Sequence, residues 1–139
     1  MMILQQQLQF ELKGRSTLNI TDEVAKIVAA SGITTGTCHV FVQHTSASLM
    51  ICENADPDVR RDLETFMQHI VPDGDAMFLH QDEGPDDMSA HIRTVLTNPD
   101  LVVPVSNGKC ALGIWQGIYL WEHRTHRQQR RVIITVQGE

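Results

Sequence analysis

The chain has 139 residues and a formal net charge of −6, with 17 acidic residues against 11 lysines and arginines. This length predicts a single domain, residues 1–139, that buries enough surface to fold without disulfides. The negative charge would oppose a phosphate backbone, so nucleic-acid binding is not expected. A membrane span is not expected either, because no apolar run reaches the roughly 18 residues that a span requires.

The cysteines and the N-terminus indicate the compartment. Cys38, Cys52 and Cys110 are odd in number and form no CxxC spacing, so reduced thiols are expected. The first residues lack the basic start and the uninterrupted apolar run of a secretory signal. These features predict a cytoplasmic protein.

The N-terminal part of the chain predicts three strands and one helix. Apolar and polar residues alternate over residues 4–12, which is typical of a half-buried strand. Thr21 as a cap and Gly32 as a stop enclose a short amphipathic helix. Residues 36–44 carry apolar side chains on both faces, which favours a central strand, and residues 49–52 form the next one.

A longer helix is expected after Asp56, because this side chain is a good helix cap and Pro57 suits the first helical position. The helix ends before Pro72. Its apolar positions predict a stripe packed on the sheet, with Phe66 and Met67 in the core. The stripe consists of Val59, Leu63, Phe66, Met67 and Ile70.

A third helix is expected near residue 90. Residues 76–80 are expected to be extended, and Asp87 then caps a helix that ends at Asn98 and Pro99. Its apolar stripe places His91 on or beside the buried face. The stripe consists of Met88, Ile92, Val95 and Leu96.

The last third of the chain predicts only strands. Asn107-Gly108 is a strong hairpin signal between strands at residues 101–105 and 109–113. Two further strands are expected at residues 116–123 and 131–136. Helices and strands do not alternate regularly, so the predicted class is α+β, a largely antiparallel β-sheet or sandwich covered by about three helices.

Three histidines are candidate ligands of one divalent ion. His44, His80 and His91 lie at the predicted ends of elements, and imidazoles supported by carboxylates are typical of metal sites. A structural role is the alternative for each, and for His91 it is that of a hydrogen-bonded core histidine. The loop between His80 and His91 supplies the carboxylates Asp82, Glu83, Asp86 and Asp87.

Charge is distributed unevenly along the chain. Eleven of the 17 acidic residues lie between Glu53 and Asp87. Four arginines fall within eight positions near the C-terminus, and guanidinium groups suit phosphate oxygens. This pattern indicates a metal-binding middle and an anion-binding end, with pairing between the two groups as the alternative. The arginines are Arg124, Arg127, Arg130 and Arg131.

Five motifs in order resemble the YjbQ-type family, described as secondary thiamine-phosphate synthases, over essentially the whole chain. The resemblance implies an α+β fold around a large β-sheet, a homotrimer and a weak thiamine-phosphate synthase activity. The motifs are H-T-S-A-S-L at 44–49, E-N-A-D-P-D-V at 53–59, H-x-x-E-G at 80–84, A-H-I at 90–92 and G-I-W-Q-G-I-Y-L at 113–120.

The implied reaction joins hydroxymethylpyrimidine diphosphate to a thiazole phosphate and releases pyrophosphate, so negative charge develops on the leaving group. A metal on the three histidines, and Arg124 or Arg127, are the candidates to meet that charge. The remaining candidates are Glu53, Asp56 and Glu83 as catalytic carboxylates, and Trp115 and Gln116 as substrate-binding residues.

Alternatives remain open for these roles. Asp56 would serve only as a helix cap, and Trp115 would fill the sheet interface. Three imidazoles favour zinc, nickel or iron, whereas a diphosphate reaction ordinarily uses magnesium. Zinc is therefore expected from ligand type and magnesium from the reaction. Two other functions follow from this mismatch: a metal-dependent hydrolase of a small phosphate or other ester, and a non-catalytic trimeric module that binds a metal or anion.

Overall fold

The computed structural model describes residues 1–139 and has the predicted α+β class. Its helices and strands, in chain order, are β1 (Met2–Leu12), β2 (Ser16–Asn19), α1 (Thr21–Ser31), β3 (Thr35–Val42), β4 (Ala47–Glu53), α2 (Pro57–Ile70), α3 (Asp87–Leu96), β5 (Asp100–Ser106), β6 (Lys109–Cys110), β7 (Gln116–Glu122) and β8 (Gln128–Gly138). None of the helices is long and apolar enough to cross a bilayer.

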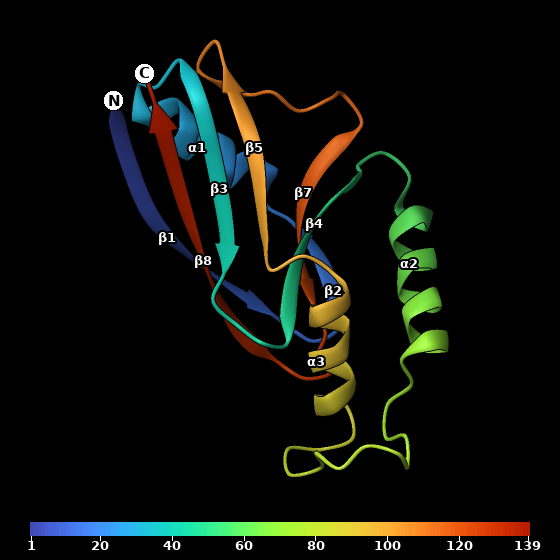
Figure 1. Cartoon of the computed structure of the whole chain (residues 1–139). Helices are drawn as coiled ribbons and strands as arrows, with labels where there is room; N and C mark the ends of the chain where they lie inside the picture. The colour runs from blue at the N-terminus through green and yellow to red at the C-terminus, as the bar shows by residue number, and fades with distance from the viewer.

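The strands form two antiparallel sheets. The five-stranded sheet has the order β1-β8-β3-β5-β6, and the three-stranded sheet has the order β2-β7-β4. Strand β3 lies between β8 and β5, which confirms the predicted central strand (Figure 1). Asn107 and Gly108 have φ angles of 53° and 76°, so they form the predicted two-residue hairpin between β5 and β6.

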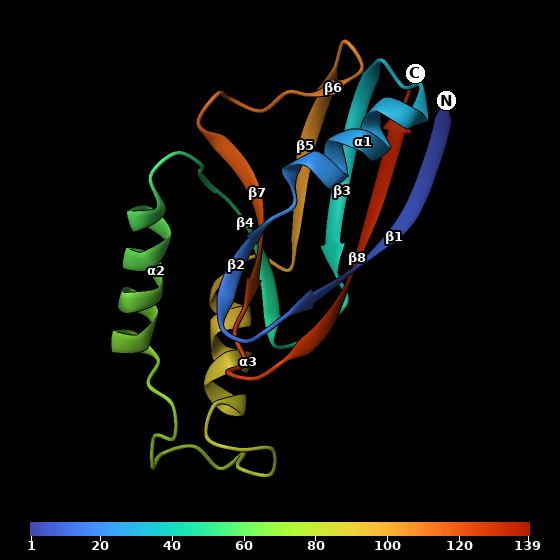
Figure 2. The same cartoon turned by 180° about the vertical axis from the view of Figure 1, so that it is seen from behind.

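The main core lies where the two sheets and α1 meet. Val24 and Val28 of α1 belong to the same buried cluster as Val40 of β3, Leu49 of β4 and Leu120 of β7. Figure 2 shows α1 lying across one face of the five-stranded sheet. The sequence therefore predicts this layer correctly, because its apolar residues follow the periods of a helix and of strands.

Helix α2 begins at the predicted residue, but fewer of its apolar side chains are buried than predicted. Oδ1 of Asp56 accepts a hydrogen bond from the backbone N–H of Asp58 at 2.9 Å and caps the helix. Met67 is buried in a small cluster with Trp121. Phe66 is 59% exposed, so the prediction that it is a core residue is wrong. The reason is that α2 stands beside the three-stranded sheet and is not covered on its other side (Figure 1).

Helix α3 buries polar residues where an apolar stripe was predicted. Asp86, not Asp87, is the N-cap, and Asp87 is the first helical residue. Val95 and Leu96 are 83% and 57% exposed, which overturns the predicted stripe. Partners make the polar face stable, since Arg93 donates to both carboxylate oxygens of Glu64 at 2.9 and 3.0 Å. The buried residues of α3 are Asp87, Ser89, Ala90, Arg93 and Thr94.

Three boundaries also differ from the prediction. Residues 76–80 form a turn at 76–77 followed by irregular chain and not a strand, and Met77 donates its backbone N–H to Asp75 Oδ1 at 3.0 Å. Thr21 is the first residue of α1, and its hydroxyl accepts from the backbone N–H of Ile118 at 2.8 Å. Strand β2 was not predicted, because four residues are too few to show a period.

Candidate metal centre

Three side chains converge around the first turns of α3. His80, from the loop before the helix, has its Nε2 2.5 Å from Oδ2 of Asp87. His91 has its Nε2 3.3 Å from the same oxygen. The i, i+4 spacing of Asp87 and His91 places both on one face of α3. The three ligand atoms lie within 4.8 Å of one another, and we call this group the His80–Asp87–His91 cluster.

Neighbouring groups orient two members of the cluster. Nδ1 of His91 lies 2.9 Å from the carbonyl oxygen of Thr45, so it carries the proton and donates. Oδ1 of Asp87 accepts from Nη1 of Arg124 at 2.9 Å. Partners of this kind fix the tautomer and the orientation of metal ligands. Nε2 of His91 and Oδ2 of Asp87 are therefore left to face His80.

The donor set fits a zinc-type ion. Two imidazole nitrogens and one carboxylate oxygen are standard ligands, and bonds of roughly 2.0–2.1 Å in a tetrahedron put ligand atoms roughly 3.3 Å apart. His91 and Asp87 already have this separation, at 3.3 Å. His80 is closer to Asp87, at 2.5 Å, so its ring must move back from Asp87 for both atoms to bind one ion.

Asp87 and Asp86 are held as carboxylates. Burial raises the pKa of Asp87, but the hydrogen bond from His80 and the charges of His91 and Arg124 lower it by more, so the pKa lies below its usual value. Burial likewise raises the pKa of Asp86, and hydrogen bonds led by Arg124 bring it well below its usual range. The cluster therefore keeps a negative charge that favours a cation.

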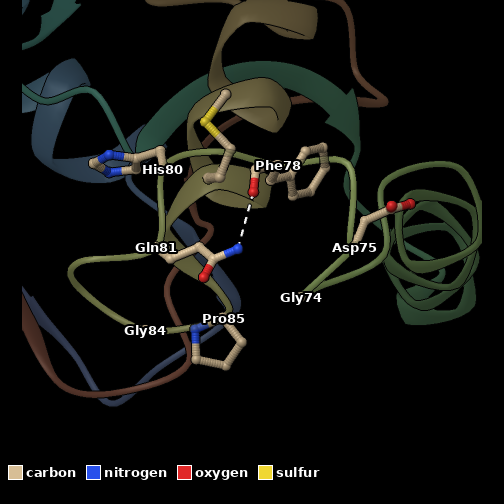
Figure 3. Close-up of a pocket in the computed structure, with 8 residues that line it drawn as sticks. Gly74, Asp75, Phe78, His80, Gln81, Gly84 and Pro85 are labelled. Atoms are coloured by element: carbon tan, nitrogen blue, oxygen red, sulfur yellow. Dashed lines mark hydrogen bonds between the residues drawn. The ribbon is translucent and has the colours of Figure 1, made fainter.

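Hollows lie on both sides of the cluster. On the His80 side, a pocket of about 330 Å³ is lined by the loop before α3. Figure 3 shows His80 and Asp75 at opposite ends of it, and the amide of Gln81 donates to the carbonyl oxygen of Phe78 at 3.0 Å. On the other side, a hollow of about 450 Å³ begins at His91. A small molecule in either hollow would lie beside the cluster.

The structure brings His80 and His91 together but leaves His44 outside the cluster. Nε2 of His44 accepts the backbone N–H of Arg131 at 2.8 Å, so this nitrogen is not free. Burial and the charges of Arg130 and Arg131 lower the pKa of His44, which stays neutral. It lines the hollow beside His91 and so borders the candidate site within one chain.

Arg124 forms ion pairs with acidic residues. The sequence offered this pairing as the alternative to anion binding. Its Nε lies 3.0 Å from Oδ2 of Asp86, and its Nη2 donates to the carbonyl oxygen of Glu83 at 2.9 Å. The Glu83 side chain is 69% exposed, and its carboxylate lies 3.7 Å from Arg124 at the rim of the site. Arg127 is exposed and forms an ion pair with Glu11 away from the cluster.

The other candidate residues gather at the opposite end of the three-stranded sheet. Glu53 pairs with Gln116 across β4 and β7, and the seven residues of β7 place this pair roughly 20 Å from Arg124. Oε2 of Glu53 accepts the backbone N–H of Asp56 at 2.9 Å, and Asp56 caps α2. Both carboxylates thus accept hydrogen bonds from backbone amides, and neither reaches the cluster.

Trp115 and Gln116 lie in the segment that enters β7. Trp115 is 60% exposed, so it does not fill the sheet interface. Oε1 of Gln116 accepts the backbone N–H of Gly113 at 2.7 Å and shapes the loop. An exposed indole can still stack on a flat ligand, but within one chain that ligand would not touch the His80–Asp87–His91 cluster.

Comparison with known proteins identifies the family. The model of the family described as "UPF0047 protein YjbQ-like" matches residues 6–139. The chain belongs to this family. A UPF0047 protein of Synechocystis is 50% identical over 127 residues, which covers 91% of this chain and 86% of that protein. YjbQ of Escherichia coli is 43% identical over 136 residues, with 97% and 98% covered.

Solved structures of YjbQ-like proteins have the same fold. One from Sulfolobus solfataricus, described as a protein of unknown function, has a TM-score of 0.86 at 25% identity and covers 99% of both chains. One from Clostridium acetobutylicum, described as an uncharacterized conserved protein of the YjbQ/UPF0047 family, has a TM-score of 0.83 at 34% identity, covering 94% of this chain and 99% of its own. The arrangement of sheets and helices is therefore that of the YjbQ-like family.

Sequence reasoning missed two features of this YjbQ-like chain. Asp87 was named as a helix cap and as one of four carboxylates near His80 and His91, but not as the direct partner of both imidazoles, although its i, i+4 spacing to His91 was visible in the sequence. The second is a buried pair under α3, in which Nε2 of His123 lies 2.8 Å from Oγ of Ser48. Burial and the charge of Arg93 lower the pKa of His123 to about 3, so this ring is neutral.

Proposed function

We propose that this YjbQ-like protein binds one divalent metal ion, zinc by ligand type, through His80, Asp87 and His91. The observation that supports this most directly is the orientation of the ligand atoms. Thr45 and Arg124 occupy the far sides of His91 and Asp87, which leaves Nε2 of His91 and Oδ2 of Asp87, 3.3 Å apart, available to an ion. Side chains held in this way before an ion binds are typical of metal sites.

The activity that we propose for this centre is the weak thiamine-phosphate synthase reaction. A bound divalent ion supplies positive charge next to the diphosphate that leaves. Arg124 keeps Asp87 ionised and fixed in place, because it donates to Oδ1 at 2.9 Å. Phe78 and Met88 line the hollow on the His80 side and give it an apolar wall suited to a pyrimidine ring.

A metal-dependent hydrolase of a small phosphate ester is the second candidate. Two imidazoles and one carboxylate are the ligand set of zinc hydrolases that activate a water molecule, whereas magnesium sites for diphosphates are built from oxygen ligands. The donor atoms of His80 and His91 are the observation that supports this second candidate. Its substrate would also be small and anionic.

Metal content tests the centre itself. Full-length protein dialysed against zinc should hold about one ion per chain, and His91→Ala or Asp87→Asn should hold less than about a tenth of that, since loss of one of three ligands costs affinity steeply. His39→Ala is the matched control, because His39 pairs with Asp100 on the five-stranded sheet. Full zinc occupancy in natively folded His91→Ala and Asp87→Asn proteins would contradict the proposal.

Activity measurements separate the candidate functions. The zinc-loaded, chelator-treated and His91→Ala proteins are each assayed for thiamine-phosphate formation and for hydrolysis of a phosphate monoester. Formation of thiamine phosphate that follows metal content supports the synthase. Hydrolysis that follows metal content supports the hydrolase. Metal binding without either reaction would support the non-catalytic module.

We also propose that the protein is a homotrimer. Val95 and Leu96 of α3 and Val102 of β5 are large apolar side chains that are 83%, 57% and 59% exposed in the single chain. They flank the connection between α3 and β5, next to the hollow that begins at His91. Apolar residues grouped on a surface favour contact with another protein surface, and symmetric copies are the most common partners.

A further inference from the structure

A third hollow lies between β2 and α2 and shares no residue with the His80–Asp87–His91 cluster. Its volume is about 430 Å³, and Trp121 of β7 forms part of its floor. Figure 2 shows β2 facing α2 across this region. We call it the Arg60 pocket. Its polar lining residues are Arg15, Ser16, Thr17, Arg60, Arg61 and Glu64.

Arg60 is held in place but keeps free donors. Its Nη1 donates to the carbonyl oxygen of Glu53 at 2.9 Å, and its guanidinium carbon lies 4.7 Å from the centre of the Tyr119 ring. These contacts fix the plane of the guanidinium group. Nε and Nη2 of Arg60 make no hydrogen bond within the chain, and no carboxylate forms an ion pair with it.

Two carboxylates near the Arg60 pocket, Glu64 and Asp73, are already paired with other arginines. Both oxygens of Glu64 accept from Arg93 at 2.9 and 3.0 Å. Arg15 donates to both oxygens of Asp73 at 2.9 Å. Because these charges cancel in pairs, Glu64 and Asp73 do not oppose an anion that enters the pocket and meets the unpaired charge of Arg60.

Arg61 and two hydroxyl groups complete the polar wall. Arg61 pairs with Asp58 at 3.2 Å, but both side chains are largely exposed, so that pair is weak and can rearrange. Ser16 donates its hydroxyl to the carbonyl oxygen of Gly14 at 2.7 Å, and this leaves its oxygen to accept. The hydroxyl of Thr17 makes no hydrogen bond within the chain and can donate to a ligand.

We propose that the Arg60 pocket binds a phosphate group of a small molecule. A guanidinium with two free N–H donors in a fixed plane matches two phosphate oxygens, and Arg61 supplies a second positive charge for a dianion. The Thr17 hydroxyl adds a donor from the opposite wall. This site needs no metal ion and is separate from the centre proposed above, so either proposal can fail alone.

Titration calorimetry of the full-length protein with inorganic phosphate and with pyrophosphate tests the pocket, with and without zinc. Arg60→Met should weaken binding about tenfold or more, and Arg60→Lys should recover only part of it, because a lysine keeps the charge but lacks the planar pair of donors. Arg61→Met should weaken binding by about threefold. Lys109→Met, on an exposed lysine of β6 at the edge of the five-stranded sheet, is the control and should leave affinity unchanged.

Each contrary result is decisive once thermal unfolding shows that the variants are folded. No binding of either anion at millimolar concentration would overturn the proposal. Equal affinity in the natural protein and in both Arg60 variants would also overturn it. Binding that disappears in His91→Ala and survives in Arg60→Met would assign the anion to the metal centre instead.

Discussion

Arg124 acts as a structural cation at the base of the loop before α3. Its guanidinium group is 9% exposed and donates to Asp86, Asp87 and the carbonyl oxygen of Glu83. Both carboxylates are themselves almost fully buried, at 8% and 3% side-chain exposure. A buried ion pair contributes less than its contacts suggest, but removal of one partner leaves charges that nothing compensates.

Replacement of Arg124 should therefore destabilise the protein strongly. Arg124→Met is expected to lower the free energy of unfolding by about 3–5 kcal/mol, the cost of breaking a buried pair, as measured by urea denaturation. Arg127→Met should lower it by no more than about 1 kcal/mol, because that pair is exposed. An Arg124→Met protein as stable as the natural one would contradict this structural role. Arg124 would then again be a candidate for binding the anionic ligand.

His123 predicts a pH dependence of stability. Its pKa is about 3 in the folded protein against 6.5 for an ordinary histidine, so between these values the unfolded chain binds a proton that the folded chain does not. Above pH 6.5 His123 is neutral in both states, so it does not lower the free energy of unfolding. As the pH falls from 6.5 towards 3, the free energy of unfolding decreases by about 1.4 kcal/mol per pH unit.

A variant isolates this effect. His123→Gln keeps a polar group within reach of Ser48 and removes the titrating ring, so the slope of its unfolding free energy between pH 6.5 and 5 should be shallower than in the natural protein. Urea denaturation at several pH values measures both slopes. His69→Gln, on an exposed residue of α2, serves as the control. Equal slopes in all three proteins would show that His123 does not cause the dependence.

At the scale of elements, the start of α2 explains why Asp56 was a candidate for catalysis. Its carboxylate accepts the backbone N–H of Asp58 at 2.9 Å, and its own N–H is accepted by Glu53 at 2.9 Å. The two acids each accept backbone N–H groups at the same helix entry. Because Glu53 and Asp56 follow the end of a strand, the sequence is compatible with a catalytic role and with a capping role. The hydrogen bonds favour the capping role.

Removal of the cap should affect stability and not the metal centre. Asp56→Ala is expected to lower the free energy of unfolding by about 0.5–2 kcal/mol, the usual loss for a helix N-cap, with zinc content unchanged. Asp62→Ala removes an exposed acid from the same helix and should change stability by less than about 0.5 kcal/mol. Thermal unfolding and metal analysis give both readouts. Loss of zinc in Asp56→Ala would instead tie Asp56 to the centre.

The sequence predicted those elements whose apolar residues face one buried side. Strand β3 and helix α1 follow this rule, because their partners are apolar faces of the main core. Helix α3 does not, since Arg93 is buried against Glu64, a specific polar partner that lies 29 residues away in sequence. Periodicity reports apolar spacing and carries no information about such partners.

The same limit applies to the candidate site. His80, Asp87 and His91 come from neighbouring positions, so their closeness could be inferred from one loop and one helix turn. The place of His44 depends on the pairing of its segment with β8, and no local pattern shows that pairing. Residues that meet through sheet topology are thus the ones for which sequence reasoning fails.

At the scale of the whole molecule, two groups of candidate residues lie at opposite ends of β7, with Trp115 at one end and the metal centre at the other. One small substrate cannot touch both within a single chain, because the ends of the strand are roughly 20 Å apart. If both groups serve one reaction, they come from different copies of the chain. The exposed apolar residues near the α3–β5 connection are the surface that would bring the copies together.

Light scattering should therefore give a mass of three times the 15.6 kDa of one chain at micromolar concentration. Val95→Glu should reduce it to the monomer mass while circular dichroism stays unchanged, because a charge at a residue that is 83% exposed in the single chain harms only the contact between copies. Ile3→Glu, at a residue of β1 that is exposed to 65%, is the matched control and should stay trimeric. A natural protein that is monomeric at this concentration would remove the trimer, and a trimeric Val95→Glu protein would place the interface elsewhere on the surface.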